Sequence, residues 1–226
     1  MLNDFTLEVC CGDLPSVQAA IAGGAQRVEL CRDLDVDGLT PTAAMMQEAV
    51  GMGIAVQVLI RPRAGDFVYS EAEVQAMLED INQARRLGAH GVVIGALKAD
   101  GSVDEAVVRR LVKEAEGLSI TFHRAFDVCA RPKEALEQII ELGCQRLLTS
   151  GQAPTAEQGI DLIKQLVEQS AGRLSIMPGA GVNVGNARRI LVETGAREIH
   201  GSLRRGGHTD AELVRELREK VISKTE

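Results

Sequence analysis

Two short apolar segments each carry a glutamate two positions before a cysteine. The segment LEVCC places Glu8 before Cys10, and the segment RVELC places Glu29 before Cys31. A carboxylate in a buried strand costs free energy unless a partner compensates its charge. The repeated pair therefore predicts a polar site inside the protein, where carboxylates and thiols meet other charged groups or an ion.

More polar residues lie at the ends of other β-rich segments. The expected acid–base residues are Glu8, Glu29, His123, Asp127 and His200. The expected residues for binding an anion are Arg61, Arg63, Ser150, Gly179, Gly181 and Ser202. Gly179 and Gly181 belong to the turn MPGAGV. They are included because glycine-rich turns let backbone N–H groups approach a phosphate or another anion.

The elements that must position these residues alternate along the whole chain. The β-rich segments are 7–11, 27–31, 55–62, 91–97, 119–126, 146–150, 173–179 and 198–202. Amphipathic helical stretches separate them, and capping boxes are expected at Ser70–Glu73, Ser102–Glu105 and Thr209–Glu212. This alternation predicts a parallel sheet covered by helices.

A repeat of glycines distinguishes a closed barrel from an open sheet. Gly24, Gly88, Gly143 and Gly195 each end a helical stretch and lead into every second strand. The inner layers of an eight-stranded barrel come from alternate strands, so this period favours a closed structure. We therefore predict an α/β fold, a TIM (β/α)8-like barrel with a single domain over residues 1–226. A doubly wound open sheet explains the period less well.

The same glycines give the direction of the strand side chains. Side chains alternate between the two faces of a strand. Counted from each glycine, one face collects Glu29, Cys31, Ser150, His200 and Ser202, which a helix-packing face would not contain. We therefore expect this face, with Glu8 and Cys10, to point into the barrel. Active sites of such barrels lie at the carboxyl ends of the strands, and the site is expected there.

The two inward thiols have three interpretations. They are ordinary buried cysteines, or a disulfide, or ligands for one soft metal ion, since neighbouring strands lie about 4.8 Å apart. Cys11, Cys129 and Cys144 are expected to be structural. The acids have two interpretations: a structural ion-pair network with Arg61 and the histidines, or acid–base groups around a pocket.

The composition excludes several classes of protein. The 226 residues carry a net charge of −7 with no basic run, which argues against nucleic-acid binding. No apolar stretch reaches the ~20 residues of a membrane span, and the N-terminus shows no export signal. Five scattered cysteines do not form a disulfide framework, so we expect a reduced, cytoplasmic protein.

The ordered motifs LEVCC, VELC, GLTPT, IRPRAGDFVYS, TFHRAFD, LLTSG, MPGAGV and EIHGS resemble the CutC copper-homeostasis family from about residue 5 to 203. The resemblance implies a TIM-barrel-like fold, a cytoplasmic location, a role in copper homeostasis and homodimers or higher homo-oligomers. It also implies that Cys10 and Cys31 bind Cu(I). This chain departs from the family at Ala64, where glycine is usual, and at Asp37-Gly38, which replaces a Gly-Gly turn.

Three functional hypotheses follow. The first is copper homeostasis through Cu(I) bound by Cys10 and Cys31. The second is a metal-independent enzyme of isomerase or lyase type, acting on a small anionic metabolite that Arg61 and the glycine-rich turn hold. The third is a barrel whose polar interior only stabilises the fold.

Overall fold

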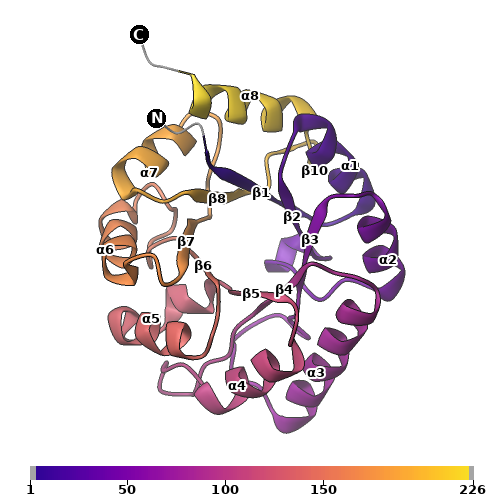
Figure 1. Ribbon diagram of the computed structural model, residues 1–226, viewed down its shortest axis with the longest axis vertical. Helices are drawn as coiled ribbons and strands as arrows, with labels where there is room; N and C mark the ends of the chain where they lie inside the picture. Colours follow the sequence, from indigo (N-terminus) through magenta and orange to yellow (C-terminus); the bar gives the residue numbers. More distant parts are fainter. Residues whose placement is uncertain (1–3, 224–226) are drawn as a thin grey trace.

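The computed structural model describes residues 4–223 and shows a ring of eight parallel strands inside a ring of helices (Figure 1). The strands are β1 (Thr6–Cys11), β2 (Arg27–Leu30), β3 (Ala55–Leu59), β4 (Gly91–Ile94), β5 (Ser119–Phe122), β6 (Arg146–Thr149), β7 (Ser175–Pro178) and β8 (Glu198–Gly201). Hydrogen-bonded neighbours follow the order β7-β6-β5-β4-β3-β2-β1-β8, and β7 lies beside β8, so the ring is nearly closed. The predicted (β/α)8-like barrel is confirmed. Residues 1–3 and 224–226 of the predicted domain lie outside the described residues.

Helices form the outer layer. They are α1 (Leu14–Gly23), α2 (Ala43–Gly51), α3 (Glu71–Arg86), α4 (Glu105–Glu114), α5 (Pro132–Glu141), α6 (Ile160–Ser170), α7 (Ala187–Thr194) and α8 (Ala211–Ile222). Short elements follow three of the strands: η1 (Leu34–Val36), η2 (Arg124–Val128) and the hairpin β9 (Arg204–Arg205) and β10 (His208–Thr209). Within residues 4–223, no helix has the length and apolar character needed to cross a bilayer.

Local signals at the helix ends account for most of the boundaries. The capping box of α3 is confirmed, with Ser70 and Glu73 each bonding the other's backbone N–H. The other two predicted boxes are wrong, because Asp104 caps α4 and Asp210 caps α8. Each aspartate lies directly before its helix and accepts hydrogen bonds from first-turn N–H groups, as good N-caps do.

The repeated glycines adopt a left-handed backbone. Their φ angles are 87° at Gly24, 84° at Gly88, 90° at Gly143 and 75° at Gly195. These values let each helix stop and turn directly into the next even-numbered strand.

Alternation along the strands divides the interior into two layers. Leu7, Val9 and Cys11 belong to the large apolar core between strands and helices. A separate, smaller cluster lies on the opposite face of the strands and consists of Cys10, Cys31, Leu59 and Val93. The predicted inward direction of the two thiols is therefore confirmed.

Candidate functional site

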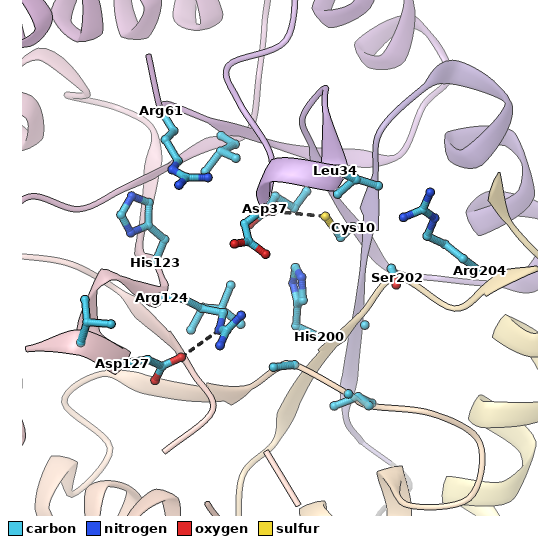
Figure 2. A pocket seen from close by; sticks show the side chains of 18 of the residues that line it. Cys10, Leu34, Asp37, Arg61, His123, Arg124, Asp127, His200, Ser202 and Arg204 are labelled. Carbon is cyan, nitrogen blue, oxygen red and sulfur yellow. Dashed lines mark hydrogen bonds and ion pairs between the residues drawn. The ribbon is translucent and has the colours of Figure 1, made fainter. Parts of the chain in front are cut away.

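A pocket of about 410 Å³ lies at the carboxyl ends of the strands (Figure 2). The predicted site residues that line it are Cys10, Glu29, Arg61, His123, Asp127, Gly181, His200 and Ser202. Those that do not line it are Glu8, Cys31, Arg63, Ser150 and Gly179. Eight of the thirteen predicted residues thus converge on one cavity.

Glu8 is fully buried between a histidine and an arginine. Its Oε1 lies 2.9 Å from Nδ1 of His200, and its Oε2 pairs with Nε of Arg27. Burial alone would raise the pKa of Glu8, but the His200 hydrogen bond and the Arg27 charge outweigh burial and lower the pKa to about 2. The expected pairing of Glu8 with Arg61 is wrong. Arg27, which lies opposite Glu8 in the register of β1 and β2, supplies the charge.

Arg27 extends this ion pair into a network beneath the pocket. Its Nη2 pairs with Glu198, whose carboxylate also lies 3.1 Å from Nε of Arg146. Two arginines and the carboxylates of Glu8 and Glu198 therefore compensate one another inside the barrel. A structural ion-pair network therefore exists, as one interpretation of the sequence expected, but its arginines are Arg27 and Arg146 and not Arg61. Of Glu8 and Glu29, only Glu8 belongs to it.

His200 connects this network to the pocket. Burial opposes its protonation, but contact with the Cys10 thiol and with Glu8, together with the charge of Glu29, raises the pKa of His200 well above its usual value. This shift favours the imidazolium form, which donates from both nitrogens. Glu8 takes one donor, so the pocket wall at His200 is cationic.

The thiols of Cys10 and Cys31 lie side by side. Sγ of Cys10 is 3.7 Å from Sγ of Cys31 and 3.4 Å from Oε1 of Glu29. Contact with Cys31, followed by burial, raises the pKa of Cys10 well above its usual value. All five cysteines are free thiols. Cys10, Glu29 and Cys31 form one group whose ligand atoms all lie within 4.8 Å of one another.

Glu29 is only 5% exposed and is incompletely paired. Its Oε1 accepts from Cys10, but its Oε2 has no hydrogen-bond partner among residues 4–223. Burial raises the pKa of Glu29, and the nearby charge of His200 only partly offsets this effect. A buried carboxyl with a raised pKa is suited to take up and release a proton.

His123 is a neutral histidine in the pocket wall. Its Nδ1 accepts a hydrogen bond of 3.1 Å from the N–H of Ala125, so its proton lies on Nε2. Burial, followed by repulsion from the Arg61 charge, lowers the pKa of His123 to about 3. Its ring lies 5.0 Å from the ring of Phe67, and no residue within 4–223 bonds Nε2.

Arg61 is a buried cation that forms no ion pair among the described residues. Its Nη1 donates to the carbonyls of Val36 at 2.6 Å and Gly38 at 2.9 Å, and its Nη2 donates to Gly65 at 3.2 Å. These bonds connect the loops after β2 and β3. Three of the five donors of the guanidinium are used, which leaves Nε–H and one Nη2 hydrogen.

Asp127 lines the pocket, but the surrounding chain occupies its carboxylate. It accepts from Nε of Arg124 at 2.8 Å, from Oγ1 of Thr149 at 2.5 Å and from the N–H of Ser150 at 3.0 Å. The Ser150 hydroxyl donates to the carbonyl of Ala153. Asp127 and Ser150 therefore connect η2 to the loop after β6.

Arg63 points away from the pocket. Its Nε pairs with Glu73 at 2.5 Å and its Nη2 with Asp66 at 2.9 Å. These bonds hold the loop before α3, so we leave Arg63 out of the proposed site.

The glycine-rich turn after β7 contributes backbone to the pocket. Gly181 lines the cavity with φ of 69°, and Ala180 beside it also has a left-handed backbone, with φ of 78°. Gly179 lies behind the wall, where a Cβ would be 2.5 Å from the Leu148 side chain. Ser202, after β8, completes this side of the cavity.

Several lining residues were not predicted as site residues. They are Leu34, Asp37, Leu59, Phe67, Arg124, Val128, Leu148, Ala180, Val182, Gly201 and Arg204. Three of these are charged, and Figure 2 shows Asp37, Arg124 and Arg204 around the cavity. Arg27, beneath the pocket, was also missed, although it shares strand parity with Glu29 and Cys31. Strand alternation, applied to residue 27, would have placed the Arg27 side chain inside the barrel.

Comparison with known proteins identifies the family. The sequence profile of the CutC family matches residues 5–205. A CutC family protein of Bacteroides thetaiotaomicron is 49% identical over 217 residues, which are 95% of this chain and 87% of the relative. A CutC family protein of Glaesserella parasuis is 51% identical over 197 residues, which are 87% of this chain and 81% of the relative.

Solved structures agree with this assignment. A CutC from Streptococcus agalactiae, described as a candidate copper homeostasis protein, superimposes with a TM-score of 0.84 at 35% identity. The match covers 88% of this chain and 98% of that one. Thiamine phosphate pyrophosphorylase from Pyrococcus furiosus has a TM-score of 0.66 at 18% identity, over 97% of this chain and 96% of its own, and shares the barrel fold alone. The profile match over most of the chain and the identity to these relatives show that this chain belongs to the CutC family.

Proposed function

We propose that this chain takes part in copper homeostasis by binding Cu(I) as cargo through Cys10 and Cys31. The observation that carries the proposal is the 3.7 Å separation of two buried, free sulfur atoms inside the barrel. Cu(I) is a soft ion that prefers thiolate ligands. The description of the Streptococcus agalactiae CutC as a candidate copper homeostasis protein agrees with this chemistry.

The surroundings of the thiols set conditions for binding. Oε1 of Glu29 is close enough to act as a third, harder ligand. Because the pKa of Cys10 is raised, copper must displace its proton, and binding then releases protons to solvent. The proposal therefore predicts a site that works best in a reducing and non-acidic medium.

A competition titration tests the copper proposal. Reduced protein is titrated with Cu(I) against a chelator of known affinity, and we expect one tight equivalent per chain. The double variant Cys10→Ser/Cys31→Ser should lose this equivalent. Cys129→Ser/Cys144→Ser is the matched control, because those thiols are also buried but belong to the outer core. Equal affinity in both double variants would refute the proposal.

The charges around the pocket support a second function, an enzyme acting on a small anionic metabolite. Arg61, Arg124, Arg204 and the imidazolium of His200 all line the cavity. Three acidic residues, Glu29, Asp37 and Asp127, line the same cavity, so the cationic groups outnumber them by one. Cationic groups beside acid–base residues suit an anionic substrate. We expect small dicarboxylates or sugar phosphates to raise the melting temperature by mass action. Arg124→Ala should lose this shift, and Arg110→Ala, on the outer surface, should keep it.

A cytoplasmic location is part of the proposal, since a reducing compartment keeps five cysteines as thiols. A homodimer or higher homo-oligomer stays a prediction from the family resemblance, and light scattering of the purified chain measures it.

A further inference from the structure

Cys31, one of the two proposed copper ligands, is closed off from solvent. Its side chain is fully buried and does not line the pocket, whereas Cys10 is 8% exposed and does line it. An ion held by both sulfur atoms has to contact Sγ of Cys31, so part of what covers this thiol must move before the ion can enter. The covering segment therefore controls loading of the site.

Residues 33–38, which follow β2 and contain η1, form part of this cover. Leu34 packs against the cluster that contains Cys10 and Cys31, and it also lines the pocket. Gly38 lies so close to Cys31 that a Cβ added to it would be 3.4 Å from Sγ. Figure 2 shows Leu34 beside Cys10, with Arg61 on the far side of Asp37. The segment thus contacts the thiol cluster near both of its ends.

The same segment has few attachments to the barrel. No residue of η1 is buried, and Val36 is 41% exposed. At the base of the segment, Arg32 and Leu39 exchange backbone hydrogen bonds of 3.0 and 2.8 Å. Asp33 and Asp37, at the two ends of η1, have left-handed backbones with φ of 55° and 65°, a conformation that is uncommon for residues other than glycine. A short loop with a tied base and few buried contacts can open locally while the barrel stays folded.

Arg61 ties this segment to the opposite side of the pocket mouth. Its Nη1 donates to the carbonyls of Val36 and Gly38, and its Nη2 donates to the carbonyl of Gly65 in the loop after β3. Within residues 4–223, Arg61 is the only residue outside 32–39 that forms a hydrogen bond with residues 33–38. The ring of Phe67, 5.3 Å from the guanidinium, packs against this connection.

We propose that residues 33–38 form a lid over the paired thiols and that Arg61 is the latch that holds the lid closed. This inference rests on the proposed copper function and adds the route by which the cargo enters. Closed, the lid covers Cys31 with Leu34 and Gly38; open, it exposes this thiol to the pocket. Arg61 acts through the lid and is a positioning residue. Release of bound ion requires the same opening as loading, so the latch slows both steps.

Alkylation of the reduced, metal-free protein with N-ethylmaleimide tests the lid without copper. Peptide mass spectrometry gives the initial rate at each cysteine, and Cys144, which is buried in the outer core, reports global unfolding. Cys31 should react faster than Cys144 in the wild type. Arg61→Met should raise the Cys31/Cys144 rate ratio at least about tenfold, because the closed lid loses two hydrogen bonds from a charged group.

Two further variants make this result specific. Arg63→Met is the matched control, because Arg63 bonds only residues 64–73 and should leave the ratio unchanged. Leu34→Ala removes a half-buried part of the cover and should also raise the ratio, whether or not Arg61→Met folds. Loss of a positive charge disfavours a thiolate, so faster alkylation in Arg61→Met reports exposure and not charge. Equal rates at Cys31 and Cys144 in the wild type and in Leu34→Ala would overturn the lid. A ratio no higher in Arg61→Met than in Arg63→Met would overturn the latch.

Removal of bound Cu(I) by excess chelator connects the lid to the cargo. In the range where the rate no longer depends on chelator concentration, lid opening limits release, and Arg61→Met should release Cu(I) at least about tenfold faster. Its Kd should change little, because the lid covers the empty and the loaded site alike. Unchanged release would overturn the role of the lid in loading. Absence of Cu(I) binding, together with the expected alkylation pattern, would instead refute the copper function and leave the lid over Cys31 in place.

Discussion

Replacement of Glu8 by glutamine should destabilise the protein through charge rather than shape. The pKa of Glu8 falls from the ordinary 4.5 of a glutamate to about 2, because His200 and Arg27 outweigh the opposing effect of burial. A difference of 2.5 pKa units corresponds to about 3 kcal/mol of folding free energy at pH 7, at roughly 1.4 kcal/mol per unit. Glu8→Gln removes this contribution and leaves Arg27 without its buried partner.

The sign of the pH dependence follows from the lowered pKa. A carboxylate with a lowered folded-state pKa stabilises the protein fully above 4.5, and this stabilisation fades as the pH falls towards 2. Urea denaturation should therefore show a difference between wild type and Glu8→Gln of about 3 kcal/mol at pH 7 and about 1 kcal/mol at pH 3. An equal difference at both pH values would refute the electrostatic account.

Glu137 provides a matched control. Hydrogen bonds from Arg173 and Gln169 also lower the pKa of Glu137 to about 2, but this carboxylate lies on the surface. Solvent screens such pairs, so Glu137→Gln should change the free energy of unfolding far less than Glu8→Gln does. Comparable losses in the two variants would show that burial does not determine the effect.

Three further perturbations test other parts of the site. Arg27→Met removes the cation that Glu8 and Glu198 share and leaves them only His200 and Arg146. It should lower the free energy of unfolding by about 3–5 kcal/mol in urea denaturation, and a loss below about 1 kcal/mol contradicts the network. The Cu(I) affinity should rise from pH 6 to pH 8 in competition titrations, because Cys10 must lose its proton, and a flat profile counts against thiolate ligation. Gly95→Ala places a Cβ 2.5 Å from the His123 ring. It should cost about 1–3 kcal/mol and shift the His123 ring resonances in NMR spectra, whereas unchanged resonances would contradict this packing.

Strand alternation made much of the interior predictable from sequence. The period of two within strands and the glycines before every second strand place Cys10, Cys31, Glu29 and His200 inside the barrel, as the structure shows. These patterns arise from backbone geometry, which local sequence determines strongly.

The loops were less predictable, because alternation ends where a strand ends. Arg61 and Arg63 are two residues apart and were expected to act together, but only Arg61 turns towards the pocket. The path of the loop after β3 decides this, and that path depends on contacts with Val36 and Gly38 from the loop after β2. Periodicity carries no information about such contacts between distant segments.

The pair formed by Glu8 and His200 joins residues 192 positions apart. It is one of the contacts that complete the ring, since β1 and β8 are neighbours in the sheet. Contacts of such long range carry a large loop-closure entropy and tend to form late in folding. During synthesis, therefore, the pair of Glu8 and His200 forms only after nearly the whole chain has emerged from the ribosome. A product truncated before β8 would contain Cys10 and Cys31 but lack His200, the partner of Glu8.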